Sequence, residues 1–456
     1  MSKKIQVLFA AGAVSLAAVV AGTWLLAPEP VQPTVVLVVL DTVRADHLSV
    51  CGYGRRTSPT LEALVANGAQ ISCGAISPGA WTLPSHASFF TGVMPVEHRA
   101  HSISTGIDSF KGGGNRARPL DQKLPTIAER FRDMGYETAL VSANPVVGPS
   151  MGLDRGFDSL DVADRFGRYT SSRWQPTVDL FLDHRDPTVP QFLAVNIADA
   201  HQPWGAPPAS LEWASEYGVG ISYSKGNREG DYSTYLRGEM DPLRAPRFEE
   251  QVVEAYDAAV FKADENLAYF LDKLLQQGFC DAAGCRVIIT SDHGELLGDQ
   301  GLLDHGHYAY QANVEVPLIV AQLGGPPELE WEDIDLPERI SAVVVHDVLL
   351  TGRLPSPLPP VQVIAWPHAR RCANLDGAAF CNLQAAIWEG DEKLIWDEGQ
   401  VTAYDLSTDP NELQGSAAAT TDELAKLAKS GKRDGRDDSK TDITVTEMLK
   451  AAGYLE

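Results

Sequence analysis

The sequence predicts an α/β fold in which a large, mainly parallel β-sheet lies between helices and is followed by a small C-terminal α+β subdomain. Short uninterrupted apolar runs rich in β-branched residues recur before residue 354, as expected of strands buried on both faces. Segments with helical period separate these runs, and that alternation is typical of parallel sheets. The strands are expected at residues 35–40, 70–76, 138–143, 192–197, 287–290 and 316–320.

Glycine residues mark the ends of the expected helices, because glycine adopts the left-handed conformation that commonly follows a last helical turn. The longest of these segments carries one continuous apolar stripe, which we interpret as core packing without a functional role. The helices are expected at residues 60–67, 125–134 and 248–277, which Gly68, Gly135 and Gly278 follow.

The pattern changes near residue 354, so we expect a main domain over residues 33–353 and a C-terminal subdomain with its tail over residues 354–456. Two long segments in the main domain, residues 102–120 and 205–247, lack a regular pattern. Loops of that length are often lids or substrate-selecting insertions. The C-terminal part shows short strands at residues 361–365, 385–388 and 393–396, a polar stretch at 415–441 and a last short helix at 445–452.

The N-terminus resembles an export signal. Lys3 and Lys4 precede an uncharged apolar run that ends near Ala27. Residues 1–27 are therefore expected to be a signal peptide or an N-terminal membrane anchor, and the sequence leaves both alternatives open. In either case the body of the protein is exported, to the periplasm or another extracytoplasmic space.

Six cysteines fit an oxidising compartment, and the pairs nearest in sequence suggest disulfides. A zinc site is the weaker interpretation, since no CxxC pair occurs. The pairs are Cys51 with Cys73, Cys280 with Cys285, and Cys372 with Cys381.

The charge balance is strongly acidic, with 37 Lys and Arg against 61 Asp and Glu and a formal net charge of −24. This disfavours nonspecific attraction to nucleic acid or to an anionic membrane surface. An anionic substrate would need a local positive charge such as a bound metal ion.

Several side chains capable of binding a metal fall where predicted strands end. Ligands bind beyond the carboxyl ends of the strands in open parallel sheets, so these residues are expected to converge. Together they offer oxygen and nitrogen donors that suit a divalent ion such as Mn²⁺ or Zn²⁺. They are Asp41, Thr82, His201, Asp292 and His293, with His305 and His307 ahead of the strand at 316–320.

Thr82 stands two residues before Pro84, which suits the first turn of a helix expected over residues 84–91 and ended by Gly92. Backbone N–H groups at that helix start would favour a tetrahedral anion. A threonine hydroxyl is a poor nucleophile, but coordination to a divalent metal lowers the pKa of such an oxygen acid by many units. Thr82 is therefore a candidate nucleophile.

Across residues 35–455 the chain resembles sulfatase-like members of the alkaline phosphatase superfamily. The resemblance implies that family's fold, with a sulfatase-like catalytic domain over residues 33–353. The blocks that carry it appear in the family's order: VVLDTVRADHLSVCGYG, TLPSHASFFTGVMPVEH, LPTIAERFRDMGYETALVSAN, GLDRGFD, NIADAHQPW, TSDHGELLGDQGLLDHGHYAYQANVEVPLIV and AYDLSTDPNEL.

The resemblance implies roles for individual residues. Asp41, Asp292 and His293 match metal ligands, and Thr82 matches the nucleophile. His201 lies where family members contact the substrate or leaving group. His305 and His307 match a block that adds further metal or substrate contacts.

This chain departs from true sulfatases at the nucleophile. Their Cys (or Ser)-x-Pro-Ser-Arg signature, whose first residue becomes formylglycine, reads Thr82-Leu-Pro-Ser-His86 here. Threonine cannot form that aldehyde, so elimination of sulfate from an aldehyde hydrate is not available. His86 could replace the signature arginine as a phosphate contact or could cap local structure, and the sequence does not separate these roles.

The ligand positions also differ, since the acidic pair reads Asp41-Thr42 and the usual Asp-Asn reads Asp292-His293. Nitrogen ligation favours Mn²⁺ or Zn²⁺, although Ca²⁺ remains an alternative. The Asp-His pair is similar to that of phosphonate monoester hydrolases, and the threonine to that of lipid-linked phosphoethanolamine and glycerophosphate transferases.

These features predict a metal-dependent hydrolase that cleaves phosphate or phosphonate esters through a covalent Thr82 intermediate, with His201 or His305 protonating the leaving group. The substrate would be a small-molecule, glycan or lipid ester. The alternatives are a sulfuric ester hydrolase, a phosphotransferase acting on an envelope lipid or glycan, and a non-catalytic binding protein. The sequence does not predict an oligomeric state.

Overall fold

The computed structural model describes residues 32–103, 116–164, 171–204, 211, 231–281, 283–325, 334–366 and 382–434. The expectations for residues 1–27, for the helix at 445–452 and for the Cys372–Cys381 pair lie outside these ranges. Within them, no helix combines the length and apolar character needed to cross a membrane.

The main sheet has eight strands in the order β12-β2-β11-β8-β1-β7-β5-β6. All of them run parallel except β11, which is antiparallel to both of its neighbours, so the predicted large, mainly parallel sheet is confirmed. Two short strands, β6 and β12, were not predicted because they carry few apolar residues. The strands are β1 (Thr34–Leu40), β2 (Gln70–Ile76), β5 (Glu137–Ser142), β6 (Ser159–Val162), β7 (Gln191–Ile197), β8 (Cys285–Thr290), β11 (Glu315–Leu323) and β12 (Arg339–Ser341).

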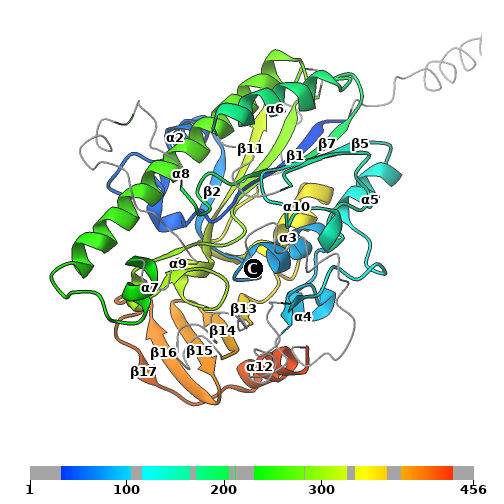
Figure 1. The fold of residues 1–456 in the computed structure, drawn as a ribbon. Coiled ribbons are helices and arrows are strands. Elements are labelled where there is room, and N and C mark those ends of the chain that lie inside the picture. Colours follow the sequence, from blue (N-terminus) through cyan, green and yellow to red (C-terminus); the bar gives the residue numbers. More distant parts are fainter. Residues whose placement is uncertain are drawn as a thin grey trace, which may run out of the picture. The chain divides into compact units, whose positions relative to one another are not determined.

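Helices cover both faces of this sheet (Figure 1). Alternate residues of β1 point to opposite faces. Val36, Val38 and Leu40 therefore pack with α2 (Pro59–Ala66), α6 (Ser171–Asp183) and α8 (Ala245–Gln276). Val35, Leu37 and Val39 pack with α3 (Thr82–Thr91), α5 (Ile127–Asp133) and α10 (Val345–Thr351). Burial on both faces explains why β1 is apolar throughout.

The predicted glycine stops are confirmed, since Gly68, Gly135 and Gly278 all have positive φ. The apolar stripe of α8 is buried, as expected of core packing. Helix α3 differs from its prediction because it begins at Thr82 and not at Pro84. Proline is tolerated there, since first-turn N–H groups have no intrahelical acceptor to lose.

The C-terminal part is a small α+β unit, as predicted. Its antiparallel sheet has the order β13-β14-β15-β16-β17. Helix α12 (Asp422–Asp434) falls in the stretch predicted only to be polar, but Leu424, Leu427 and Ala428 form a narrow apolar stripe that packs on the sheet. The strands are β13 (Gln362–Ala365), β14 (Gln384–Glu389), β15 (Glu392–Asp397), β16 (Gln400–Asp405) and β17 (Ser416–Ala417).

The two sheets share buried contacts. One apolar cluster contains Ile76 and Val314 from the main sheet region together with Val363, Trp388 and Ile395 of the small sheet. The buried Lys393 ammonium on β15 lies 2.5 Å from Glu412 and donates to Gln311 Oε1 at 3.0 Å. Apolar packing and the hydrogen bond from Lys393 to Gln311 therefore join the small unit to the main sheet region.

Two of the three disulfides expected from sequence proximity are present, Cys51–Cys73 and Cys280–Cys285. The first joins the segment after β1 to strand β2, and the second closes the turn between α8 and β8.

Candidate active site

Asp41 follows directly on β1 and is fully buried. Its Oδ2 accepts hydrogen bonds from the side-chain amides of Asn144 at 2.7 Å and Asn196 at 3.0 Å. The next residue, Thr42, has a φ of 64°, a left-handed conformation that is uncommon outside glycine. Its backbone N–H donates to Asp292 Oδ1 at 3.2 Å, so the turn after β1 is bonded to the turn after β8.

The Tyr256 hydroxyl on α8 supports this turn from behind. It donates to the Thr42 carbonyl at 2.7 Å and accepts from the Arg44 backbone N–H at 2.8 Å. The α8 stripe was interpreted as core packing alone, but Tyr256 also holds the segment that follows Asp41. Apolar periodicity does not distinguish a packed tyrosine ring from one whose hydroxyl fixes a neighbouring turn.

Asp292 and His293 follow β8 and are also fully buried. His293 Nδ1 lies 2.9 Å from the Gly294 carbonyl oxygen, which can only accept, so Nδ1 carries the proton. The other ring nitrogen, Nε2, is then left with its lone pair, the form in which histidine binds metals.

Thr82 lies at the first position of α3, and Trp81 provides no side-chain cap for that helix. The Thr82 hydroxyl lies 3.5 Å from His293 Nε2 and accepts from the Asn144 amide at 3.1 Å. Asn144 therefore bridges Thr82 and Asp41. The first-turn N–H groups of α3 have no intrahelical acceptor and favour an anion beside Thr82.

The donor atoms fit a divalent metal ion. Asp41 Oδ1 and Asp292 Oδ2 are buried and have no hydrogen-bond partner among the described residues. They lie 3.9 Å and 3.5 Å from His293 Nε2. Ligands about 2.1 Å from a tetrahedral ion are about 3.4 Å apart, so small adjustments would bring all three into coordination. A cation would satisfy both carboxylate oxygens, which are costly to leave buried and unpartnered.

The metal-free site shifts the ionisation of its ligands. Burial and repulsion by the Asp292 carboxylate raise the pKa of Asp41 to about 7. Burial raises the pKa of Asp292 to about 7 as well. Burial lowers the pKa of His293 to about 4, so the ring is neutral at physiological pH. Neutral histidine is already suited to coordination, whereas the carboxyl groups must lose protons.

We expect metal binding to strengthen as pH rises through about 7, because ionised carboxylates are the ligands. The raised pKa values mean that the metal-free fold binds more protons than the unfolded chain, so these groups cost it stability as pH rises from about 4 through about 7. The increase in melting temperature produced by Mn²⁺ or Zn²⁺ should therefore be small near pH 5.5 and larger near pH 8. Thermal denaturation at several pH values tests this, and an increase independent of pH would contradict it.

His86 has a protein partner at each ring nitrogen. Nδ1 lies 3.0 Å from the Thr82 carbonyl oxygen, and Nε2 lies 3.4 Å from the Asn196 amide. Burial lowers its pKa to about 3, so it is neutral. Of its two sequence-based roles, this geometry favours support of local structure over contact with a phosphate.

Two of the remaining predicted histidines, His201 and His305, pack against each other. The His305 ring is 4.4 Å from the His293 ring and 5.0 Å from the His201 ring, measured between centroids. His305 thus lies next to a candidate metal ligand, and His201 lies beside His305. His307 is buried and packs beside Tyr308.

Four further residues of the site were not predicted. Asn144 and Asn196 bind Asp41, and Glu295 and Asp304 form a second acidic group around His305. A signal for two of them was present, because Asn144 follows the strand expected at 138–143 and Asn196 lies near the end of the one at 192–197.

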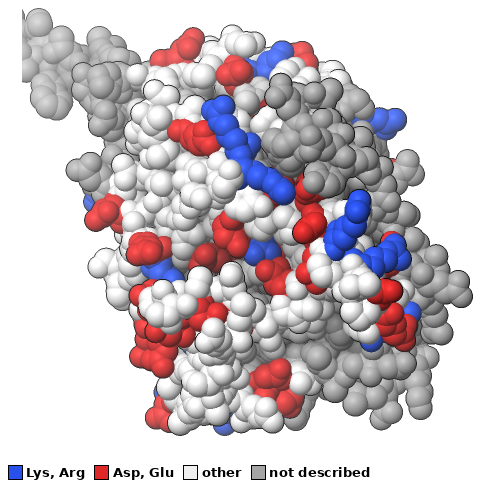
Figure 2. Space-filling model, turned by 90° about the vertical axis from the view of Figure 1, so that its left-hand side faces the viewer, with Lys and Arg blue, Asp and Glu red and all other residues white. Residues whose placement is uncertain are grey.

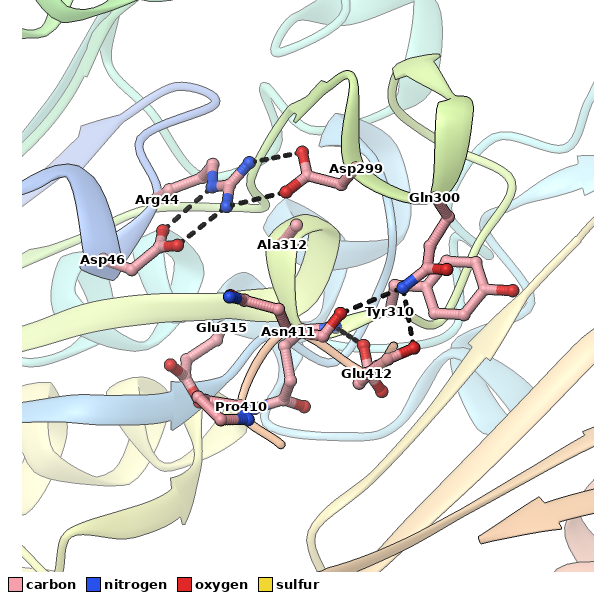
Figure 3. Close-up of a pocket in the computed structure, with 11 residues that line it drawn as sticks. Arg44, Asp46, Asp299, Gln300, Tyr310, Ala312, Glu315, Pro410, Asn411 and Glu412 are labelled. Carbon is pink, nitrogen blue, oxygen red and sulfur yellow. Dashed lines mark hydrogen bonds and ion pairs between the residues drawn. The ribbon is translucent and has the colours of Figure 1, made fainter. Parts of the chain in front are cut away.

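Arg44 lies three residues after Asp41 and is held by two carboxylates (Figure 3). Its guanidinium pairs with Asp46 at 2.7 Å and with Asp299 at 2.7 Å, and it donates to the Glu295 carbonyl at 3.0 Å. Gln300, next to Asp299, donates to the carbonyls of Asn411 and Glu412 in the C-terminal unit. On the face shown in Figure 2, acidic and basic side chains are interspersed among uncharged residues.

A sequence model of the sulfatase family matches residues 33–352, which is most of the chain. The uncharacterized sulfatase YidJ of Escherichia coli K12 is 20% identical over 435 residues, covering 84% of this chain and 82% of that protein.

Solved structures share the fold. The phosphonate monoester hydrolase of Agrobacterium radiobacter is 18% identical with a TM-score of 0.56, and the match covers 88% of this chain and 94% of that one. BT4656 in complex with its substrate D-glucosamine-2-N,6-O-disulfate is 16% identical with a TM-score of 0.59, covering 89% and 99%. The family match and the shared fold show that this chain belongs to the sulfatase family and is a sulfatase-like hydrolase of the alkaline phosphatase superfamily.

Proposed function

We propose that the protein is a metal-dependent hydrolase of phosphate or phosphonate esters that uses Thr82 as its nucleophile. The observation that supports this most is the position of the Thr82 hydroxyl at a helix start, 3.5 Å from His293 Nε2 and bonded to Asn144. A binding protein has no need of a hydroxyl placed beside a metal-ligand set.

Asp41, Asp292 and His293 would hold the ion, with the Thr82 hydroxyl beside them. Mn²⁺ and Zn²⁺ suit this mixed set better than Ca²⁺. The ion would offset negative charge on the ester oxygens and lower the pKa of the Thr82 hydroxyl.

The Thr82 hydroxyl first loses its proton to solvent. In the first step the Thr82 oxygen anion forms a bond to phosphorus while the bond to the leaving oxygen breaks, and the leaving oxygen takes a proton from His201 or His305. In the second step water attacks phosphorus, a histidine accepts its proton, and the bond to Thr82 breaks to release phosphate or phosphonate. Asn144 helps throughout by donating to the Thr82 oxygen as it gains negative charge.

Phosphorus is favoured over sulfur because a threonine ester of sulfate has no aldehyde hydrate from which sulfate can be eliminated. The family match supports sulfuric ester hydrolysis as the second candidate, and an acceptor alcohol in place of water would make the same site a transferase. The two disulfides support our proposal that the protein works outside the cytoplasm.

The test assays protein lacking residues 1–31, stripped of metal and reloaded with Mn²⁺, Zn²⁺ or Ca²⁺. The substrates are aryl esters of phosphate, phosphate diester, phosphonate and sulfate. Thr82-dependent turnover of a phosphorus ester supports the proposal and identifies the ester class. Turnover of the sulfate ester alone would overturn the preference for phosphorus.

Replacing Asn144 should slow the first step. We expect Asn144→Ala to lower kcat/KM by about 10- to 100-fold, because one hydrogen bond to a developing charge is lost. Asn144→Asp should lower it further, since a carboxylate would repel both Asp41 and the ionised Thr82 oxygen. Steady-state kinetics with the ester selected above measure both effects, and an Asp variant as active as the Ala variant would contradict this role.

A further inference from the structure

Glu295 lies between two loops that carry histidines. Its carboxyl group is fully buried. Oε2 lies 3.0 Å from His305 Nδ1, and Oε1 accepts from the Gln202 side-chain amide at 3.3 Å. One carboxylate thus contacts both the segment that follows β7 and the segment that follows β10 (Leu303–Asp304).

The Gln202 contact reaches His201, the other candidate acid. His201 Nδ1 lies 2.6 Å from the Gln202 carbonyl oxygen, so the ring of His201 is fixed by the residue that Glu295 holds. The His305 ring in turn packs against the rings of both His201 and His293. Glu295 therefore contacts one candidate proton donor directly and the other through Gln202.

The backbone of Glu295 is itself anchored. Arg44 donates to its carbonyl at 3.0 Å and is held by Asp46 and Asp299 (Figure 3). Because Arg44 follows closely after Asp41, the same segment positions both a metal ligand and Glu295. The backbone that carries the Glu295 carboxyl group is therefore held in place by Arg44.

The second acidic group differs from the metal ligands in how its oxygens are satisfied. Both Glu295 oxygens have partners, Asp304 Oδ1 accepts from the His305 backbone N–H, and Asp304 Oδ2 accepts from the Tyr232 hydroxyl. Asp41 and Asp292, in contrast, each keep one oxygen without a partner among the residues that the structure describes. Complete hydrogen bonding suits a group that orients other side chains.

We propose that Glu295 is a positioning residue that holds His305 by its Nδ1 and His201 through Gln202, so that a proton reaches the leaving oxygen. This inference rests on the proposed function. It predicts that substitution of Glu295 lowers kcat/KM by an amount that depends on the leaving group. A good leaving group departs without a proton, whereas a poor one requires it.

The experiment compares a phenyl ester with a 2,4-dinitrophenyl ester of the ester class selected above. In Glu295→Ala we expect kcat/KM to fall about 100-fold for the phenyl ester and less than about 5-fold for the dinitrophenyl ester. Glu295→Gln keeps an acceptor for one partner, so its kcat/KM for the phenyl ester should fall less than that of Glu295→Ala. Equal losses on the two esters would overturn the proposal.

Asp264→Asn is the matched control. Asp264 is a buried carboxylate on α8 that accepts from the backbone N–H groups of Thr60 at 2.8 Å and Leu61 at 3.2 Å, at the start of α2. This variant should lower the melting temperature and leave the ratio of the two ester rates unchanged. A Thr82→Ala variant that keeps its activity would overturn the proposed function, which is a different result from equal losses in Glu295→Ala.

Discussion

Thr82→Ala should lower kcat by at least about 1,000-fold on the preferred ester, because loss of a nucleophile removes the covalent route. Metal affinity should fall much less, since Asp41, Asp292 and His293 remain. Thr82→Ser keeps a hydroxyl at the same helix position and should retain a measurable fraction of the activity.

Thr91→Ala is the control for this series. Thr91 is the last residue of the same helix, and its hydroxyl donates to the Ala87 carbonyl at 2.7 Å. It should keep near wild-type activity. Mass spectrometry after rapid acid quenching should detect added phosphoryl or phosphonyl mass on the Thr82 peptide. A Thr82→Ala enzyme within about tenfold of wild type would rule out the covalent mechanism.

Asp41→Asn should have opposite effects on metal-free stability and on metal binding. The amide oxygen can take the place of Oδ2 opposite Asn144 and Asn196, and the amide nitrogen can face His293 Nε2. The variant removes a buried carboxyl group whose pKa is raised to about 7. Above that pH a shift of about three units corresponds to about 4 kcal/mol at most. The metal-free variant should therefore melt at a higher temperature than metal-free wild type at about pH 8, with no such gain near pH 4.

The same variant should show little stabilisation by Mn²⁺ or Zn²⁺, because one charged ligand is gone. Thermal denaturation with and without metal, combined with an activity assay, measures both effects. A metal-free variant that is less stable than metal-free wild type at high pH would contradict the conclusion that the ionised Asp41 carboxylate destabilises the metal-free protein.

The sequence predicted most of the main sheet because its strands are continuous apolar runs. The runs are visible without knowledge of neighbours, since both faces of β1 are covered by helices. Strand β12 and helix α12 escaped prediction for the opposite reason. They carry few apolar residues, and these indicate a strand or a helix only when the surface on which they pack is known.

The candidate ligands were also visible in sequence, because Asp41 directly follows one buried strand and Asp292 lies two residues after the end of another. The hydrogen-bond partners were harder to predict. Asn144 and Gln202 bind groups far away in the chain, and no local pattern indicates which amide will face Asp41 or Glu295. Their roles depend on strand order and loop geometry, which come from the whole fold.

The apolar cluster shared by the two sheets bears on how the chain can be shortened. The family match stops at residue 352, and a chain cut there would expose Ile76 and Val314, which pack against Val363 and Trp388. The cut would also remove Lys393, which donates a hydrogen bond to the Gln311 side chain. The part of the chain that matches the family model is thus shorter than the part that we expect to fold on its own. A truncated protein should therefore keep residues 33–434 together.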